Sequence, residues 1–89
     1  MRILYTKSFG RDLDAIKNNP AVKKRILEII ERLKEVESLD AVQGIKKIEG
    51  YEAYYRLRIG DYRLGIKSAG NTLELIRFLH RKDIYRRFP

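Results

Sequence analysis

The sequence predicts an α+β domain in which an antiparallel β-sheet packs against an N-terminal helical hairpin. Apolar residues recur with the period of an amphipathic helix over residues 9–36, and they alternate with period two from residue 54 onward. Between the two helical stretches, Asn18-Asn19-Pro20 ends one helix and starts another. The 89 residues make one domain, 1–89, and its elements follow the order βααββββ.

The first two elements are a short strand and a helix. Ile3 and Tyr5 alternate with polar neighbours, as expected of a strand. The helix that follows carries apolar residues at positions i, i+4 and i+7, namely Phe9, Leu13 and Ile16.

The second helix begins at a clear stop-and-start signal. Asn19 is its expected N-cap and Pro20 its first residue, because proline needs no intrahelical donor there. On the solvent face, Glu28 and Arg32 have the i,i+4 spacing of an ion pair. The apolar stripe contains Val22, Ile26, Ile29, Leu33 and Val36. Two helices joined by so few residues predict an antiparallel hairpin.

The pattern predicts strands for most of the chain after residue 44. Residues 45–48 make a short strand that ends before Gly50, and the strand over residues 54–59 turns at Gly60-Asp61 into a return strand. Residues 72–80 are apolar on both faces, which is typical of a central strand covered on both sides. We expect residues 83–88 to form a short tail with about one helical turn.

A two-residue turn fixes the register of the hairpin and sorts its side chains by face. Ile59 should lie opposite Tyr62, and Arg58 opposite Arg63. The face toward the helices is apolar, with Tyr55, Leu57, Ile59, Tyr62, Leu64 and Ile66. The other face gathers polar and basic residues, namely Tyr54, Arg56, Arg58, Arg63 and Lys67.

This basic face predicts a phosphate ligand. Like charges across a strand pair destabilise the hairpin, and the net charge of the chain is +8, so a polyanion would relieve the repulsion. Guanidinium groups fork onto phosphate oxygens. Gly65, opposite Arg56, should leave a gap in which a nucleic-acid backbone approaches closely. The alternative interpretation is a solvated hairpin face on a highly charged surface.

The end of the last strand extends the basic surface with Arg77, His80, Arg81, Lys82, Tyr85 and Arg86. His80 is the only histidine, and an imidazole titrates near neutrality, so it is a candidate proton acceptor or a structural residue. Tyr85 stands among arginines. Aromatic and arginine side chains together hold single-stranded RNA by stacking on bases and binding phosphates.

The sequence offers few residues for a metal site and no segment for a membrane. There is no cysteine and a single histidine, so we expect no metal site and no cofactor. The carboxylates of Asp12, Asp14, Glu28 and Glu31 are expected on outer helix faces. No apolar run could span a bilayer and none resembles a signal peptide, so we expect a cytoplasmic protein. If the protein cuts RNA, the metal-free route uses the 2′-OH of the substrate as nucleophile.

Two segments carry a family resemblance. The hairpin YYRLRIGDYRLGI (residues 54–66) and the ending RFLHRKDIY (residues 77–85) resemble the RelE branch of the RelE/ParE toxin superfamily, the toxins of type II toxin–antitoxin systems. The resemblance implies a ribosome-dependent mRNA endonuclease that leaves a 2′,3′-cyclic phosphate, with the ribosome, mRNA and a cognate antitoxin protein as partners.

The resemblance also implies roles for single residues. Arg63 matches the arginine that holds the scissile phosphate, Arg81 the arginine that stabilises the leaving group or transition state, and Tyr85 the tyrosine that stacks on a base or activates the 2′-OH. Arg56 and Arg58 stand where well-known members carry lysines, and arginine supplies charge but cannot release a proton. His80 also departs from many members, so His80 and Tyr85 compete for the role of base.

Two other functions fit the same sequence. The ParE branch shares the fold, and its members poison DNA gyrase. A non-catalytic RNA- or ribosome-binding module would need the same basic face. RNA cleavage on translating ribosomes separates the first function from the other two.

Overall fold

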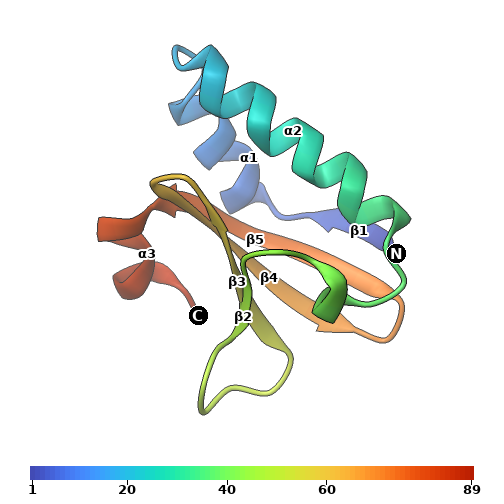
Figure 1. Ribbon diagram of the computed structural model, residues 1–89. Helices are drawn as coiled ribbons and strands as arrows, with labels where there is room; N and C mark the ends of the chain where they lie inside the picture. The colour runs from blue at the N-terminus through green and yellow to red at the C-terminus, as the bar shows by residue number, and fades with distance from the viewer.

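The structure, a computed structural model, describes residues 1–89 (Figure 1). Its elements follow the expected order, with one helix added at the C-terminal end. They are β1 (Arg2–Tyr5), α1 (Lys7–Ala15), α2 (Pro20–Glu35), a 3₁₀ turn η1 (Leu39–Ala41), β2 (Ile45–Lys47), β3 (Tyr54–Ile59), β4 (Tyr62–Ala69), β5 (Thr72–His80) and α3 (Arg81–Arg87).

The five strands form one mixed sheet in the order β1-β5-β4-β3-β2. The α+β class is confirmed, and strands β2 to β5 pair antiparallel as expected. The expectation of a wholly antiparallel sheet is wrong for β1, which pairs in parallel with β5. The reason is topological: the helical hairpin carries the chain away from β1, the sheet then grows from its far edge, and the last strand arrives beside the first.

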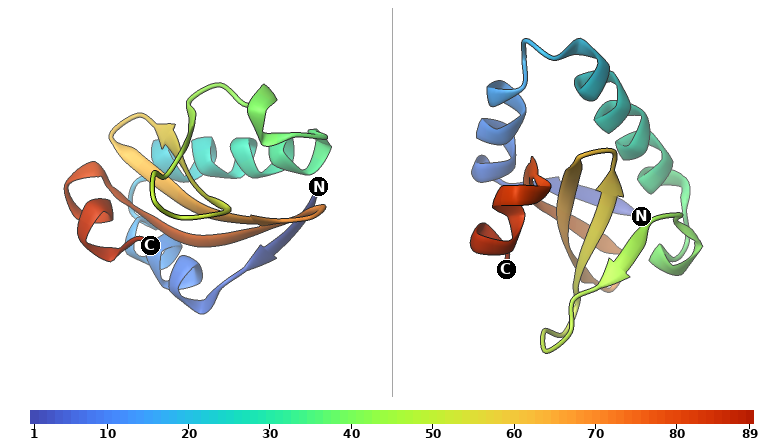
Figure 2. Two further views of the ribbon diagram at one scale, coloured as in Figure 1. Left: turned by 90° about the horizontal axis from the view of Figure 1, so that it is seen from below. Right: turned by 60° about the vertical axis from the view of Figure 1, so that its left-hand side comes forward.

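Helices α1 and α2 make a V over one face of the sheet, as Figure 2 shows. Both start at the type of cap that exposed helical N–H groups require. Thr6 Oγ1 accepts from the Phe9 N–H at 3.1 Å, and Asn19 Oδ1 accepts from the Val22 N–H at 3.3 Å, with Pro20 next. None of the helices combines the length and the apolar character that a bilayer-crossing segment needs.

The core lies between these helices and the sheet. Ile26, Ile30 and Leu33 of α2 meet the inward side chains of the hairpin. The apolar hairpin face is confirmed, since Leu57, Ile59, Leu64 and Ile66 are buried there, while Tyr55 and Tyr62 pack at its margin. Burying an aliphatic side chain of this size contributes about 1.5–3 kcal/mol, so this layer holds the sheet against the helices.

An irregularity in β5 changes which residues face the helices. Gly65 pairs with Arg77 and Ile66 pairs with Leu75, so one residue of β5 is unpaired between them. Such a bulge shifts the alternation of a strand by one position. Leu75 and Phe78 therefore both point into the core, although three positions separate them. Thr6 Oγ1 donates to the Leu75 and Ile76 carbonyls at 3.0 and 2.9 Å, which satisfies the backbone at the bulge.

Asp12 corrects an expectation about the helices. It was expected on the outer face of α1, but it is 6% exposed and shares the inner face with Phe9. Its carboxylate accepts from Arg77 Nε at 2.8 Å and Nη2 at 3.0 Å, and from the Phe78 N–H at 2.8 Å. The hydrogen bond from Arg77 to Asp12 raises the pKa of that guanidinium further. Helix α1 is thus joined to β5 by a partly buried, bidentate ion pair.

The expected ion pair between Glu28 and Arg32 on α2 does not form. The charged pair on this helix joins Glu31 and Lys34 instead, at 3.0 Å and with i,i+3 spacing. Arg32 is left exposed without an acidic partner.

The C-terminal segment is a helix of seven residues rather than a tail with one turn. It docks through Ile84 and Phe88, which are 0% and 5% exposed. The gap expected at Gly65 is occupied by the ring of Phe88. A Cβ on residue 65 would stand only 2.7–2.8 Å from that ring. Gly65 thus makes room for the anchor of α3 and not for a nucleic-acid backbone.

Candidate functional site

The basic face of the hairpin forms a hollow of about 270 Å³. We name it the basic hollow. It lies on the side of the sheet opposite the helical layer, between the hairpin and α3. Its lining residues are Gly44, Lys46, Arg56, Arg58, Arg63 and Tyr85.

Strand register brings the cations of the basic hollow together. The expected pairing of Arg58 with Arg63 and of Arg56 with Gly65 is confirmed. On the other side of β3, Lys46 of β2 pairs with Arg56. Paired residues point to the same face of a sheet, so three adjacent strands present their positive charges on one side.

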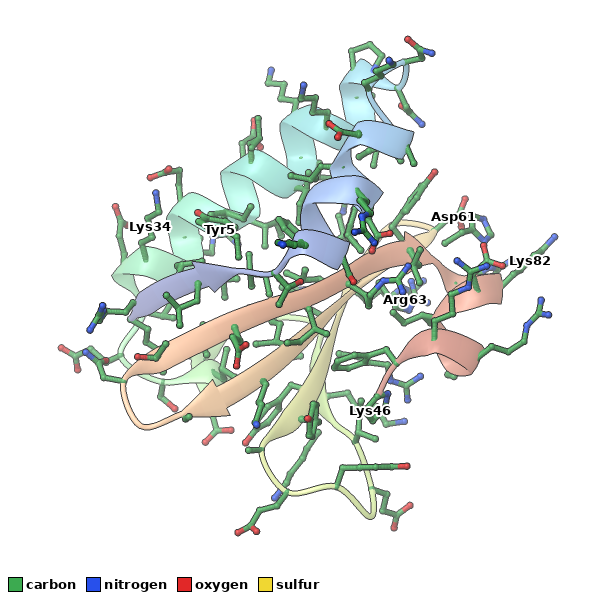
Figure 3. All side chains as sticks on the ribbon, turned by 180° about the vertical axis from the view of Figure 1, so that it is seen from behind. Tyr5, Lys34, Lys46, Asp61, Arg63 and Lys82 are labelled. Atoms are coloured by element: carbon green, nitrogen blue, oxygen red, sulfur yellow. The ribbon has the colours of Figure 1, made fainter.

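Arg63 is held in place by the turn that precedes it. Its Nη1 donates to the Gly60 and Tyr62 carbonyls, both at 2.9 Å. The guanidinium is therefore oriented before any ligand arrives, while Nε and Nη2 keep donors to offer. Figure 3 shows Arg63 at the same end of the molecule as Asp61 and Lys82, with Tyr5 and Lys34 at the opposite end.

Helix α3 contributes the aromatic side of the basic hollow. Tyr85 is 67% exposed, and the guanidinium carbon of Arg56 lies 4.5 Å from the centre of its ring. Arg81 precedes Tyr85 by one helical turn, which places the two on neighbouring positions of the same helix face. The Arg81 N–H donates to the Asp61 carbonyl at 2.8 Å, so the helix starts against the hairpin turn.

His80 lies on the other face of the sheet. It pairs with Tyr62, whose ring packs beside the core, and the two rings meet edge to face at 5.6 Å. Its Nδ1 accepts from the Lys82 N–H at 3.2 Å, so the side chain caps the start of α3. The bulge in β5 explains this position, because it turns His80 toward the helices and away from Arg63.

Four other expected RNA-binding residues lie outside the basic hollow. Arg77 is engaged by Asp12. Lys82 is exposed at the start of α3, and Arg86 is 81% exposed and 4.0 Å from Asp83. Lys67 lies at the far end of the hairpin, with its Nζ 5.7 Å above the ring of Tyr54.

Tyr54 packs against Phe88, the residue that anchors the C-terminal end of α3. Its ring meets Phe88 edge to face at 5.6 Å, and it is partly buried. The Tyr54 ring is thus already in contact with Phe88 and with Lys67, and it does not line the basic hollow.

Sequence reasoning missed Lys46 and Gly44. The short strand β2 was expected, but the loop of six residues between β2 and β3 left its register open. The alternation of the strand does not supply the missing signal, because Lys46 and Lys47 are adjacent and both are exposed.

The electrostatics of the basic hollow are one-sided. Four cations line it and no carboxylate does. None of the four forms an ion pair with an acidic side chain. Such a hollow favours an anion with several oxygen acceptors, such as a phosphodiester. No three His, Cys, Asp or Glu side chains gather anywhere on the chain in a way that could hold a metal ion.

Comparisons with known proteins show the family to which the chain belongs. A protein named Toxin RelE3 from Methanocaldococcus jannaschii is 44% identical over 90 residues, which cover 100% of each sequence. The structure of the RelB-RelE antitoxin-toxin complex from Methanococcus jannaschii contains a chain of the same fold, with a TM-score of 0.82, 44% identity and coverage of 97% of this chain and 99% of that one.

More distant structures share the fold. The archaeal RelE-RelB complex from Pyrococcus horikoshii OT3 matches with a TM-score of 0.73 and 23% identity over 90% of this chain and 93% of that one. The family described as the ParE toxin of type II toxin-antitoxin systems, parDE, matches residues 3–85. The chain belongs to the RelE/ParE superfamily and is a toxin of the type II toxin–antitoxin class.

Proposed function

We propose that this toxin is an endoribonuclease that cleaves mRNA on the ribosome without a metal ion. The observation that carries the proposal is the basic hollow, where four cations and one exposed tyrosine surround a space with no carboxylate. In this reaction the 2′-OH of the scissile nucleotide loses its proton and attacks the adjacent phosphorus. The bond from phosphorus to the 5′-oxygen breaks, and the products carry a 2′,3′-cyclic phosphate and a 5′-OH.

The roles follow from position and chemistry. Arg63, held by the turn, binds the non-bridging oxygens of the phosphate and stabilises the charge that grows on them. Arg58, directly across from it, adds a second guanidinium. Arg81 stands one turn before Tyr85 and supplies charge near the leaving oxygen.

Tyr85 is the stronger candidate for the proton-transfer or base-stacking role. It lines the basic hollow, whereas His80 lies on the opposite face of the sheet with Nδ1 already bound to the Lys82 N–H. The guanidinium of Arg56 lies 4.5 Å from the centre of the Tyr85 ring, so it holds the aromatic face at the edge of the basic hollow by a cation–π contact.

We also propose that a separate antitoxin chain covers the basic hollow. Two relatives are described in complexes of toxin with antitoxin, RelB-RelE and RelE-RelB. Unpaired cations on one face of a chain with net charge +8 favour a partner with acidic segments. Co-expression with the protein encoded by the neighbouring reading frame should yield a complex that elutes as one species in size exclusion. A chain that is harmless when expressed alone and binds no such neighbour would contradict the proposed antitoxin.

The test of the activity is cleavage of mRNA on purified translating ribosomes. We expect cuts inside the decoded codon, products ending in a 2′,3′-cyclic phosphate, and an unchanged rate in a chelator that leaves the ribosomes intact. A 2′-deoxy nucleotide at the scissile position should stop the reaction, because it removes the nucleophile. Inhibition of DNA supercoiling by gyrase without any cut in RNA would assign the toxin to the gyrase poisons instead.

A further inference from the structure

A second hollow adjoins the basic hollow on its α2 side, with a volume of about 570 Å³. Figure 2 (right) shows the turn between β3 and β4 beside α2. Gly60 of this turn lines the second hollow together with Arg25 of α2. Gly44 and Arg58 line both hollows, so the two adjoin at the end of β3. The lining of the second hollow includes Arg25, Ile29, Arg32, Gln43, Gly44 and Arg58.

Three guanidinium groups of the second hollow have no acidic partner. Arg25 and Arg32 are exposed and stand seven positions apart on α2, which places them on one face of the helix. Neither forms an ion pair, and Arg58 forms none either. Asp61 lines an adjoining hollow with Arg25 but makes no ion pair with it. The guanidinium of Arg25 lies against the turn, since its Nη1 is 3.3 Å from where a Cβ of Gly60 would stand.

We propose that the second hollow binds the backbone of the same single RNA strand whose scissile phosphate occupies the basic hollow. The proposal rests on the endoribonuclease function and extends it with a second phosphate site. Arg58, shared by the two hollows, lies under the strand as it passes from one to the other. Arg25 and Arg32 then bind a phosphate on the flanking side, with Gln43 as a polar neighbour.

The composition of the second hollow favours RNA over a protein segment. Ile29 is its one large apolar side chain, so an amphipathic peptide would find little apolar surface to bury there. Three unpaired guanidinium groups around a polar space instead fit the oxygens of successive phosphates.

The experiment measures binding of RNA that cannot be cut. Two fluorescent 2′-O-methyl probes, a trinucleotide and a nonanucleotide, are titrated with the full chain at several salt concentrations, and anisotropy reports the Kd. The variant is R25A/R32A. The matched control is K23A/K24A, which removes the same charge from the same helix at residues that line a different hollow, beside Leu27. Thermal unfolding shows that both variants fold.

We expect R25A/R32A to weaken binding of the nonanucleotide about tenfold and to make its salt dependence shallower by about 1.4 log units per log unit of salt, as for two lost phosphate contacts. Binding of the trinucleotide, which fills only the basic hollow, should stay within about twofold of wild type. The control K23A/K24A should change both probes by no more than about twofold.

Three results would overturn the inference. R25A/R32A and K23A/K24A could weaken binding alike, which would assign the effect to net charge. In the second result, R25A/R32A leaves oligonucleotide binding unchanged and weakens only binding to ribosomes, which would assign the hollow to ribosomal RNA. In the third, it leaves oligonucleotide binding unchanged and weakens only binding to the antitoxin, which would assign the hollow to an acidic protein. Because the probes have no free 2′-OH, the measurement does not depend on cleavage, so a chain that binds them and cuts nothing contradicts only the proposed function.

Discussion

Arg63 is the residue whose position the structure explains most fully. Two backbone carbonyls of the Gly60 turn orient its guanidinium, and they do so without occupying Nε or Nη2. A donor that is oriented before the reaction stabilises developing charge without paying for reorganisation during it.

Arg63→Ala should therefore reduce the rate of ribosomal mRNA cleavage by about 10²–10³-fold, the range found when one oriented donor to a transition state is removed. Arg63→Lys should lose less, because a point charge survives although the fork is gone. Single-turnover cleavage is the measurement. Arg86→Ala, an exposed arginine outside the basic hollow, is the matched control, and an equal loss in that variant would contradict a specific role for Arg63.

Tyr85 and His80 are the two candidates for the proton-accepting residue. Tyr85→Phe should lose about 10²-fold or more of the rate if the hydroxyl takes part in proton transfer. His80→Ala should keep the wild-type dependence of the rate on pH, since His80 is on the far face of the sheet and caps α3. A pH profile that loses its rise in His80→Ala, with Tyr85→Phe fully active, would reverse the assignment.

At the scale of elements, α3 depends on contacts at its C-terminal end. Phe88 packs on Gly65 and edge to face on Tyr54, and Ile84 is fully buried beneath the helix. Because Tyr85 lies between these two anchors in the sequence, the aromatic side of the basic hollow is only as well placed as the packing of Phe88.

Phe88→Ala should loosen α3 and lower the cleavage rate about tenfold, although Phe88 itself does not line the basic hollow. Gly65→Ala should act in the same direction, because its Cβ would collide with the Phe88 ring. Hydrogen exchange should show faster exchange of the amides of α3 and little change in β4 and β5. Arg87→Ala, an exposed neighbour, serves as control, and a fully active Phe88→Ala variant with unchanged exchange would refute this dependence.

The Asp12–Arg77 pair joins α1 to β5. Asp12→Ala should lower the free energy of unfolding by about 3 kcal/mol, because it leaves a guanidinium and the buried Phe78 N–H without their acceptor. Asp14→Ala, an exposed change on the same helix, should stay within about 0.5 kcal/mol of wild type. Urea unfolding followed by circular dichroism measures both, and equal stabilities for the two variants would show that the pair contributes nothing.

These contacts also show what the sequence could and could not predict. The two-residue turn at Gly60-Asp61 sets the register of β3 and β4, so the pairing of Arg58 with Arg63 was predictable. The burial of Asp12 and the position of His80 were not. The face of His80 depends on the bulge in β5, which an apolar run does not signal in the sequence. The burial of Asp12 depends on its contacts with Arg77 and the Phe78 N–H, which lie 65 and 66 residues away in the sequence.

The parallel pairing of β1 with β5 was equally hard to foresee. Local patterns predict elements, whereas the neighbour of an edge strand depends on which edge remains free after the sheet has formed. The register of Lys46 with Arg56 has the same origin, since the loop before β3 is too long to impose one pairing.

At the scale of the whole molecule, positive charge opposes the fold. The net charge is +8, and the cations that line the two hollows lack acidic partners. An anion that binds the native state stabilises it by mass action.

Phosphate should therefore raise the Tm more than chloride does at the same ionic strength. A gain of about 1 kcal/mol would correspond to about 4–8 °C in a domain of this size. The variant Arg58→Ala/Arg63→Ala should lose most of the difference between the two salts, which separates site binding from the general effect of phosphate on protein stability. A difference of the same size in the double variant would argue against an anion site.

The position of β5 between β1 and β4 means that the sheet cannot be completed until late in translation. The ribosome makes β1 first and β5 after every other strand, and contacts between distant parts of a chain form only once both parts are available. While it is being translated, the chain already contains the arginines of the basic hollow but lacks the strand that completes the sheet beneath them. We infer that a toxin with the proposed activity cannot act on the ribosome that is making it until β5 has emerged. This delay leaves time for an antitoxin to meet the chain as it folds. Limited proteolysis of stalled nascent chains should show protection of β3 and β4 only in chains long enough to expose β5, and protection in shorter chains would refute this order of events.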